Sequence, residues 1–520
     1  MREPPRGPGS IPLFSCLLLI LACIAAGVAH PAGAGEPPRR QGGESSTVAS
    51  VTPAEDRIVA AVSRDRTHRI VRDLVALGPR MGGTASGDRA AAYVDRRLRE
   101  IGLDVVVVEE PPRDLYEVTA WEASLLAPEQ EKIEAWPCGL SPPMAATEVD
   151  LRIAPPPDGS IHSPWALLTG EDPASAAKQA ARSGAAAALT DAPRIEGRFT
   201  NWAPATFIPR GLAPSAPVWT TSFNAGRKIR AWIESGKAVR ARLALDARSG
   251  SGRPRTVVGT LKGSRPGWYM ICAHGDSDSG SPGANDNASG VASLLEAAAA
   301  LSDASSKGLL PAGRPSVRFA VWGSEIASAR TYIDRVGADL PGLLGVFNYD
   351  QTGFGAAGDA LYFEGNDVPW NATILQALMS AASDRAGRDG FPRRYTTNPS
   401  LGGTDAYAFL PPRYRGFGRI TREIPAITIF TSAWGTPQEV AQTPGWQSKA
   451  WPERDRVTVD FDPYYHSSGD LPALTTDLVP DGMARCARAV ALAIYGLMAR
   501  EAGEASPGAG APPRKPAPDR

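Results

Sequence analysis

The sequence predicts an α/β fold: a mixed β-sheet with helices on both faces, interrupted by a small β-rich inserted domain. From Thr256 onward, apolar strand-like runs alternate with helical segments. This pattern is typical of a sheet covered by helices, with a site at the carboxyl ends of its strands. Between residues 115 and 250 the composition changes to many prolines and short strands. A chain of 520 residues is long enough for two domains.

The first part of the α/β domain is expected to span residues 51–114. Helical periodicity covers residues 54–77 and 87–101, and the second helix ends at Gly102, as a C-cap glycine should. A strand over residues 103–108 completes this part.

The predicted insert spans residues 115–250. Its expected elements are two short strands, an alanine-rich helix and a closing strand, at residues 166–169, 218–221, 176–188 and 239–245. Short strands separated by proline-rich turns are typical of a small β-rich unit.

The second part of the α/β domain is expected to span residues 251–500. Its strands are predicted where apolar residues form short runs, at residues 268–273, 317–322, 344–350 and 426–431. The alanine and leucine content of residues 291–301 predicts a helix.

One loop of this second part, from His274 to Gly290, carries side chains that bind metals. In an extended segment residues i and i+2 point the same way, so His274 and Asp276 can share one face, one holding a metal and the other supporting it. Asp286 arrives from the far end of the loop. The pattern predicts half of a zinc site, although by itself it also fits a polar loop at a sheet edge.

Charge and cysteine content narrow the classes of partner. The chain has 55 basic and 55 acidic residues, so nothing favours nucleic acid or an anionic membrane. Beyond the first 34 residues the cysteines are Cys138, Cys272 and Cys486, an odd number that cannot all pair. We expect Cys272 to be a small buried apolar residue rather than a ligand. The oligomeric state is left open.

The start of the chain predicts export. Residues 1–34 combine Arg2 and Arg6, an apolar stretch and Ala32-Gly-Ala34, which is the pattern of a signal peptide. The apolar run is also long enough for a short membrane span, so an uncleaved N-terminal anchor is an alternative. Ile20-Leu-Ala-Cys23 resembles a lipoprotein cleavage box, which makes a lipid anchor another alternative. The expected location is therefore secreted or periplasmic, or on a membrane as a lipoprotein.

Two segments are predicted to be disordered. Residues 35–50 are rich in Gly, Pro and Ser and form an expected linker, and residues 501–520 form a tail rich in Pro, Ala and Gly.

Six segments, in order along the chain, resemble the zinc exopeptidases of family 28 of the metallopeptidases. These include secreted bacterial aminopeptidases and glutamate carboxypeptidases. The segments are Leu77-Gly-Pro-Arg-Met-Gly-Gly-Thr84, His274 to Gly290, Arg318-Phe-Ala-Val-Trp-Gly-Ser-Glu325, Asn348-Tyr-Asp350, Gly402-Gly-Thr-Asp405 and Tyr465-His-Ser-Ser-Gly-Asp470. More loosely, the stretches around Ala180 and Ala216 resemble a protease-associated domain, a β-rich insert found in many relatives.

The resemblance implies a set of metal ligands. A first zinc ion would be held by His274, Asp286 and Asp350. A second would share Asp286 and add His466 together with the second Glu of a Glu-Glu pair. The expected cofactor is therefore zinc, as one or two ions.

The resemblance also implies the catalytic groups. Glu325 stands at the position of the general base, Tyr465 at that of the tyrosine that stabilises the oxyanion, and Asp276 beside the first histidine. Asp405 and Asp470 are expected to be structural or supporting groups rather than ligands.

The chain departs from the family at the second metal, because Ile326 stands where the metal-binding Glu belongs. Isoleucine offers no lone pair to a metal. Three outcomes remain open: the protein works with one metal; Glu325, Ser328 or Asp278 completes the second site; or the site is inactive.

The function expected from the sequence is an exported zinc exopeptidase acting on peptides, more specifically an aminopeptidase, in which Glu325 activates a water. The alternative is a pseudoenzyme on the same fold that binds peptide or another ligand. The retained Glu325, Asp350, Tyr465 and His466 favour the enzyme, because a site without constraint would lose its base as readily as a ligand. Side-chain preference and amino- against carboxypeptidase action are not fixed by the sequence.

Overall fold

A computed structural model of the chain describes residues 52–156, 163–171, 173–191, 215–355, 360–385, 387–388, 390–391, 394–398, 404–411, 420, 422–431, 464–466 and 469–504. The predicted signal peptide (residues 1–34), the linker (35–50) and the tail from residue 505 onward lie outside these residues. So do Gly402, Gly403, Ser467 and Ser468 of the motifs.

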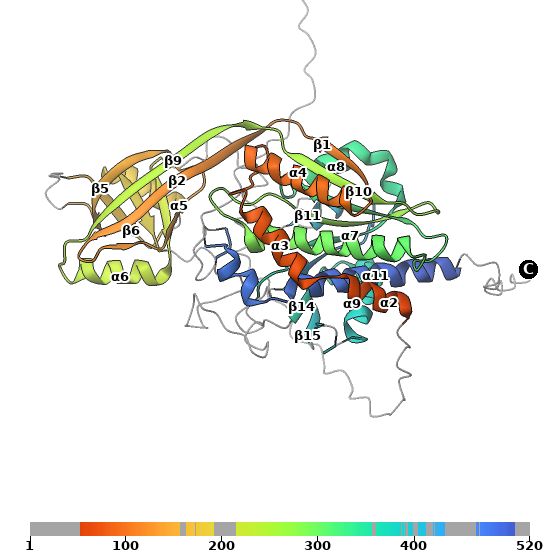
Figure 1. The fold of residues 1–520 in the computed structure, drawn as a ribbon. Helices are drawn as coiled ribbons and strands as arrows, with labels where there is room; N and C mark the ends of the chain where they lie inside the picture. Colours follow the sequence, from red (N-terminus) through yellow and green to blue (C-terminus); the bar gives the residue numbers. More distant parts are fainter. Residues whose placement is uncertain are drawn as a thin grey trace, which may run out of the picture.

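The central mixed sheet lies at the right of Figure 1. It has eight strands, in the order β1-β10-β12-β11-β13-β16-β14-β15. Their bounds are β1 Asp104–Glu109, β10 Arg255–Leu261, β12 Ser316–Trp322, β11 Trp268–His274, β13 Leu343–Tyr349, β16 Ala426–Phe430, β14 Ala360–Glu364 and β15 Arg394–Asn398. The four central strands, β12, β11, β13 and β16, run parallel, whereas β10 and β14 join them antiparallel. The carboxyl ends of the four central strands therefore meet at one edge of the sheet.

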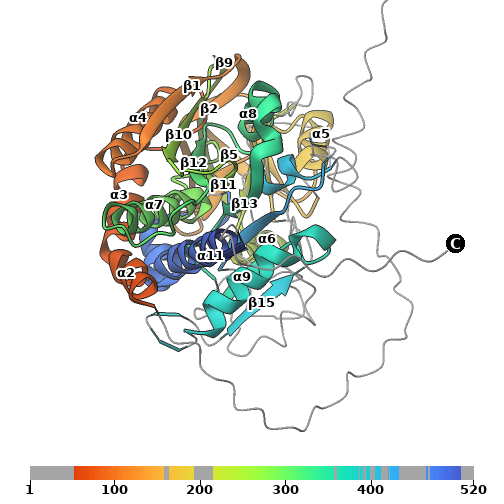
Figure 2. The same cartoon turned by 90° about the vertical axis from the view of Figure 1, so that its right-hand side faces the viewer.

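Helices cover both faces of this sheet (Figure 2). One face carries α2 (Pro53–Ala61), α3 (Arg64–Val75), α4 (Ala85–Glu100), α7 (Gly290–Ser306), α9 (Ala372–Ser383) and α11 (Gly482–Glu504). The other carries α8 (Ala327–Val336) and the short 3-10 helix η5 (Asp405–Phe409). Strand β11 is fully buried between these layers, which explains its continuous apolar run. The predicted fold class is confirmed.

Two helix predictions need correction. The helical stretch expected over residues 54–77 is two helices, because the chain is extended at Val62 and Ser63 and the Ser63 side chain caps α3 by accepting the Arg66 N–H. The helix expected up to residue 188 ends at Ser183, and Ala187–Thr190 forms strand β7 instead. Every residue of β7 is buried, and the strand has a pairing partner on each side, so tertiary pairing overrides the helical preference of its alanines.

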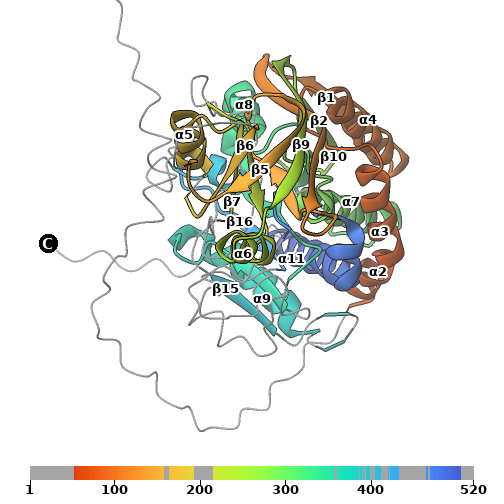
Figure 3. The same cartoon turned by 90° about the vertical axis from the view of Figure 1, so that its left-hand side faces the viewer.

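The insert faces the viewer in Figure 3. It forms a second sheet of eight strands, in the order β3-β2-β9-β5-β6-β7-β8-β4. Its elements are β2 Arg113–Ala127, β3 Glu131–Lys132, β4 Ala135–Pro137, β5 Met144–Arg152, β6 Trp165–Thr169, α5 Pro173–Ser183, β7, β8 Val218–Thr221, α6 Phe223–Glu234 and β9 Arg240–Gly252. The long strands β2 and β9 form an antiparallel ribbon that connects the insert to the central sheet (Figure 1). The likeness of the insert to a protease-associated domain stays a prediction.

Helix α11 packs into the main hydrophobic core, which lies between the central sheet and the helices on the α7 face. It extends to Glu504, past the predicted domain end at residue 500. Residues Gly482–Gly503 are long and apolar enough to cross a membrane by length and composition. However, Met483, Cys486 and Val490 are completely buried in the main core. Packing against the other helices therefore accounts for the apolar character of α11.

Candidate metal centre

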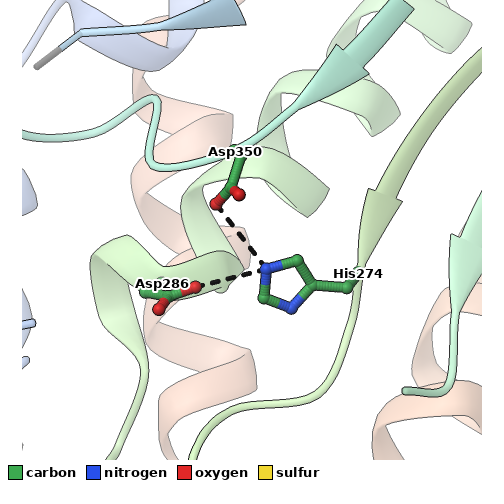
Figure 4. Close-up of side chains that lie close together, drawn as sticks. All are labelled: His274, Asp286 and Asp350. Atoms are coloured by element: carbon green, nitrogen blue, oxygen red, sulfur yellow. Dashed lines mark ion pairs between the residues drawn. The ribbon is translucent and has the colours of Figure 1, made fainter. Parts of the chain in front are cut away.

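His274 is the last residue of β11 and lies at the carboxyl edge of the central sheet. Its Nδ1 is 3.2 Å from Asp276 Oδ1, which leaves Nε2 directed at the other carboxylates. Nε2 lies 3.2 Å from Asp286 Oδ1 and 3.6 Å from Asp350 Oδ1 (Figure 4). The end of β11, the loop before α7 and the end of β13 thus bring three predicted ligands together.

Asp286 lies in a one-turn irregular helix, η2 (Ala284–Ser289), at the start of α7. Asp470 fixes this turn, because its two carboxylate oxygens accept the N–H groups of Asn285 and Asp286 at 2.7 and 2.9 Å. Asp470 therefore supports the metal loop through the backbone. Asp350 follows the last residue of β13 directly, so its position is set by a strand that is buried on both faces.

Arg80 binds backbone carbonyls of the metal loop, the segment from His274 to Gly290. Its side chain is fully buried, and its guanidinium donates to the carbonyls of Pro282 at 2.5 Å and Gly283 at 2.7 Å. Burial lowers the pKa of Arg80 to about 10, although nearby carboxylates oppose this shift. Gly283 has to be glycine here, because a Cβ would lie 2.4 Å from Ser277 Cβ and 2.8 Å from Arg80 Nη2. The sequence placed Arg80 in a motif but gave no sign of this contact.

The donor set fits a zinc ion. Among the described residues, one group of three ligand atoms lies within 4.8 Å of one another, contributed by His274, Asp286 and Asp350. Bonds of about 2.0–2.1 Å in a tetrahedral site place ligand atoms roughly 3.3 Å apart, close to the separations around His274 Nε2. Within the described part of the chain, the buried His274 Nε2 and Asp350 Oδ1 have no hydrogen-bond partner. Imidazole and carboxylate are ligands that zinc accepts in proteins.

The charges of the site also favour a cation. Burial raises the pKa of Asp350 above its ordinary value. Burial acts the same way on Asp286, but His274 and His466 outweigh it and hold the pKa of Asp286 below its ordinary range. For His274, burial lowers the pKa, and the surrounding carboxylates reverse this, so that its pKa lies well above the usual value. A divalent cation would relieve the repulsion among these carboxylates.

His466 approaches the same aspartate at its other carboxylate oxygen. His466 Nε2 is 3.0 Å from Asp286 Oδ2, and its Nδ1 is 3.8 Å from Asp278 Oδ2. The ring of Tyr465 stacks on that of His466, with centroids 3.6 Å apart. His466 therefore reaches Asp286 but lies outside the three-donor group.

Glu325 lies three residues beyond the end of β12, on the turn that begins α8. Its N–H donates to Asp276 Oδ1 at 3.1 Å, so Asp276 contacts both His274 and the backbone of the predicted base. Burial raises the pKa of the Glu325 carboxyl well above its ordinary value; His274 opposes this shift, and Asp350 and Asp286 add to it. A carboxylate with a raised pKa is suited to general-base work.

The second metal position lacks a third donor among the described acidic residues and histidines. Ile326 is buried, and its N–H donates to Asp405 Oδ1 at 2.5 Å. Neither Glu325 nor Asp278 joins His466 and Asp286 in a compact three-donor group. The hydroxyl of Ser328, another substitute ligand that the sequence leaves open, accepts the Ser324 N–H at 2.8 Å.

Two other groups lie near the centre without joining it. Cys272 is completely buried, and its Sγ contacts Asn348 Oδ1 at 3.4 Å, while burial raises its pKa well above the ordinary value. Asp405 is also completely buried and faces the backbone of Ile326. Both lie outside the three-donor group.

Known proteins are similar to this chain in sequence or in fold. The probable lipoprotein aminopeptidase LpqL of Mycobacterium tuberculosis is 26% identical over 417 residues, which cover 76% of each chain. The structure of BSAP, a zinc aminopeptidase from Bacillus subtilis, matches at a TM-score of 0.53 and 20% identity, over 84% of this chain and 95% of its own. A peptidase M28 precursor from Shewanella amazonensis matches at 0.53 and 18% identity, over 86% and 96%. At these identities the two structures show a shared fold.

The second part of the α/β domain also matches a family model. The model described as peptidase family M28 covers residues 256–494, the stretch that contains all the predicted ligands and the predicted base. Together with the aminopeptidase relative and the shared fold, this match confirms the resemblance. Over residues 256–494 the chain therefore resembles peptidase family M28, a family of hydrolases.

Proposed function

We propose that the protein is an exported zinc aminopeptidase that removes N-terminal residues from peptides. The observation that carries the proposal is the buried group of His274, Asp286 and Asp350, with Glu325 tied to it through Asp276. The similar proteins support the finer assignment, since one is named a probable aminopeptidase and another a zinc aminopeptidase.

We further propose that one zinc ion suffices. Three protein ligands with one open position are a normal arrangement for catalytic zinc. His274, Asp286 and Asp350 supply the three, whereas Ile326 removes the carboxylate that a second ion would need. When bound, zinc supplies Lewis acidity, which lowers the pKa of water to about 7 and polarises a carbonyl.

Three side chains have separate roles in the proposed reaction. Glu325 takes a proton from the attacking water, the water oxygen bonds to the scissile carbonyl carbon, and the proton passes to the amine nitrogen as the C–N bond breaks. The Tyr465 hydroxyl donates to the carbonyl oxygen as it becomes negative. Asp276 holds His274 and the Glu325 backbone in register, because one of its oxygens contacts both.

The test is Glu325→Gln in zinc-loaded protein, assayed on peptides with free and acetylated N-termini. The wild type is expected to cleave only the free peptides, and Glu325→Gln to lose about 10²- to 10⁴-fold in kcat while keeping its zinc. Asp334→Asn is the matched control, because Asp334 is exposed on α8 just beyond the base. Wild-type protein that binds peptides without hydrolysing any would instead be the pseudoenzyme, a binding protein on the same fold.

Export is proposed on the pattern of residues 1–34, with the mature chain starting near Gly35. The word lipoprotein in the name of the mycobacterial relative supports an exported protein. The intact mass of the protein from its native host distinguishes a chain cleaved near Gly35 from a lipid-anchored chain. An acylated N-terminus at Cys23 would replace the signal-peptide proposal by a lipid anchor.

A further inference from the structure

The backbone is strained at one residue of the turn that carries the proposed base. Ile326 has φ 55° and ψ −45°, and the Ala327 N–H donates to the Glu325 carbonyl at 2.5 Å. These dihedrals and this hydrogen bond between residues i and i+2 define a γ-turn of the rare, positive-φ kind. A β-branched side chain at positive φ is a steric outlier, whereas glycine adopts such a conformation freely. Something must therefore hold Ile326 in place.

Asp405 supplies the restraint. Its Oδ1 accepts the Ile326 N–H at 2.5 Å, although the two residues are 79 positions apart in the chain. A carboxylate forms a stronger hydrogen bond to a backbone N–H than a neutral acceptor does. The preceding N–H, that of Glu325, donates to Asp276 Oδ1 at 3.1 Å. Two carboxylates thus hold two successive peptide groups of the turn.

The position of Asp405 is itself fixed by packing. Asp405 begins η5, whose residues Ala406 to Phe409 are buried in the same core as α8 and the end of β12. The ring of Trp322, the last residue of β12, lies 6.3 Å from that of Phe409 and 5.4 Å from that of Tyr332 on α8. The element that bears Asp405 and the two elements that flank the γ-turn therefore form one packed unit.

The residues that follow Ile326 are held by hydrogen bonds within the first turn of α8. The Ser328 N–H donates to the Ser324 carbonyl at 2.9 Å, and the Arg330 N–H to the Ile326 carbonyl at 3.0 Å, so α8 starts at once. These bonds hold the helix but do not restrain the Ile326 N–H. Only the contact with Asp405 acts on that group among the described residues.

We propose that Asp405 is a positioning residue for the reaction, which holds the γ-turn at Ile326 and thereby aims Glu325 at the metal site. The proposal rests on the proposed function, in which Glu325 is the base. Strained backbone that persists beside a reactive group points to a functional constraint on that conformation.

The experiment compares four variants in zinc-loaded, full-length protein: Asp405→Ala, Asp405→Asn, Ile326→Gly and the double variant Asp405→Ala/Ile326→Gly. Asp405→Ala should lower kcat by about 10²-fold, the lower end of the loss of a general base, with KM and zinc content unchanged. Asp405→Asn keeps an acceptor oxygen and should stay within about tenfold of wild type.

Ile326→Gly is the informative partner, because glycine adopts the turn without strain. Ile326→Gly alone should leave kcat within about threefold of wild type. The double variant should have a kcat about tenfold higher than that of Asp405→Ala. A role confined to folding would lower apparent kcat and zinc content in the same proportion, with KM unchanged, because fewer chains would be folded.

Three results would overturn the proposal. Asp405→Ala could turn over at the wild-type rate, Asp405→Asn could be as impaired as Asp405→Ala, or Ile326→Gly could fail to rescue the alanine variant. Failure of the proposed function gives a different result. In that case the wild type itself hydrolyses no peptide, or Glu325→Gln remains active, and the positioning role falls with it.

Discussion

His274 and His466 approach different carboxylate oxygens of Asp286, and each is arranged like a metal ligand. Each directs Nε2 at one oxygen of Asp286, and each has Nδ1 near an aspartate of the same loop, Asp276 or Asp278. The His274 side adds Asp350 as a third donor, whereas on the His466 side the corresponding position holds Ile326. The site therefore has one complete half and one incomplete half.

The contacts that orient the two histidines also differ, and the shorter contact belongs to the complete half. The His274 Nδ1 to Asp276 Oδ1 distance is 3.2 Å, and the His466 Nδ1 to Asp278 Oδ2 distance is 3.8 Å, longer than a hydrogen bond. A histidine that binds a metal usually donates its other N–H to a carboxylate, which fixes its orientation. The half without the carboxylate therefore also has the longer supporting contact, while the half that shares only Asp286 with it keeps a short one.

The largest expected effect separates the two histidines. His274→Ala should abolish zinc binding and hydrolysis together, because two carboxylates alone remain of the three-donor group. His466→Ala should keep one zinc ion per chain and lose no more than about 10³-fold in kcat, the cost of one oxyanion donor, because Tyr465 loses its stacking partner. Elemental analysis after dialysis, paired with peptide hydrolysis, measures both.

A distant histidine controls for general destabilisation. His68 lies on α3 and contacts Asp477 and the Pro480 carbonyl, so His68→Gln should change neither zinc content nor turnover. If His466→Ala lost its zinc as completely as His274→Ala, the two halves would be equivalent and the single-zinc assignment would be wrong.

A smaller effect should separate the two supporting aspartates. Asp276→Asn should weaken zinc binding by about 10- to 100-fold, since outer partners of metal-binding histidines typically contribute that much. Asparagine keeps an oxygen for the Glu325 N–H, so the variant tests the charge beside His274. Asp278→Asn is the matched change on the incomplete half and should leave zinc affinity unaltered. Competition with a chelator of known affinity gives both values, and equal losses would contradict the comparison.

The sequence explains in physical terms why the three residues of the complete half lie together. His274, Asp286 and Asp350 each follow or precede a long, strongly patterned element, and parallel strands bring their carboxyl ends to one edge. Once β11 and β13 are assigned, the meeting of His274 and Asp350 follows. The mixed sheet follows in the same way from the alternation of strands and helices.

Contacts through the backbone were beyond the reach of the sequence. The hydrogen bonds from Arg80 to the Pro282 and Gly283 carbonyls, and from the Ile326 N–H to Asp405, depend on loop conformations that no periodicity encodes. The break between α2 and α3 has a weak local signal, a serine cap at Ser63, inside an otherwise helical pattern. Strand β7 had none, because its alanines favour helix until neighbouring strands pair with it.

The smallest expected effect is a gain on the incomplete half. Ile326→Glu returns a carboxylate to the position where the family has one, and zinc content should rise from one ion per chain to two. The turn should accept the change, because its conformation is fixed by the contacts of Asp276 and Asp405 with backbone N–H groups rather than by the Ile326 side chain.

Ile326→Gln is the matched control for this gain. It has the length of glutamate without its charge, so it should leave zinc content at one, and a rise in both variants would show that the ion responds to space rather than to a carboxylate. The second ion should appear only when His466 is present, since His466 and Asp286 are the other donors on that half. Ile326→Glu/His466→Ala should therefore return to one zinc. A folded Ile326→Glu protein that still holds a single ion would mean that the γ-turn aims the side chain of residue 326 away from Asp286. In that case the backbone conformation, and not only the missing carboxylate, prevents the incomplete half from binding zinc.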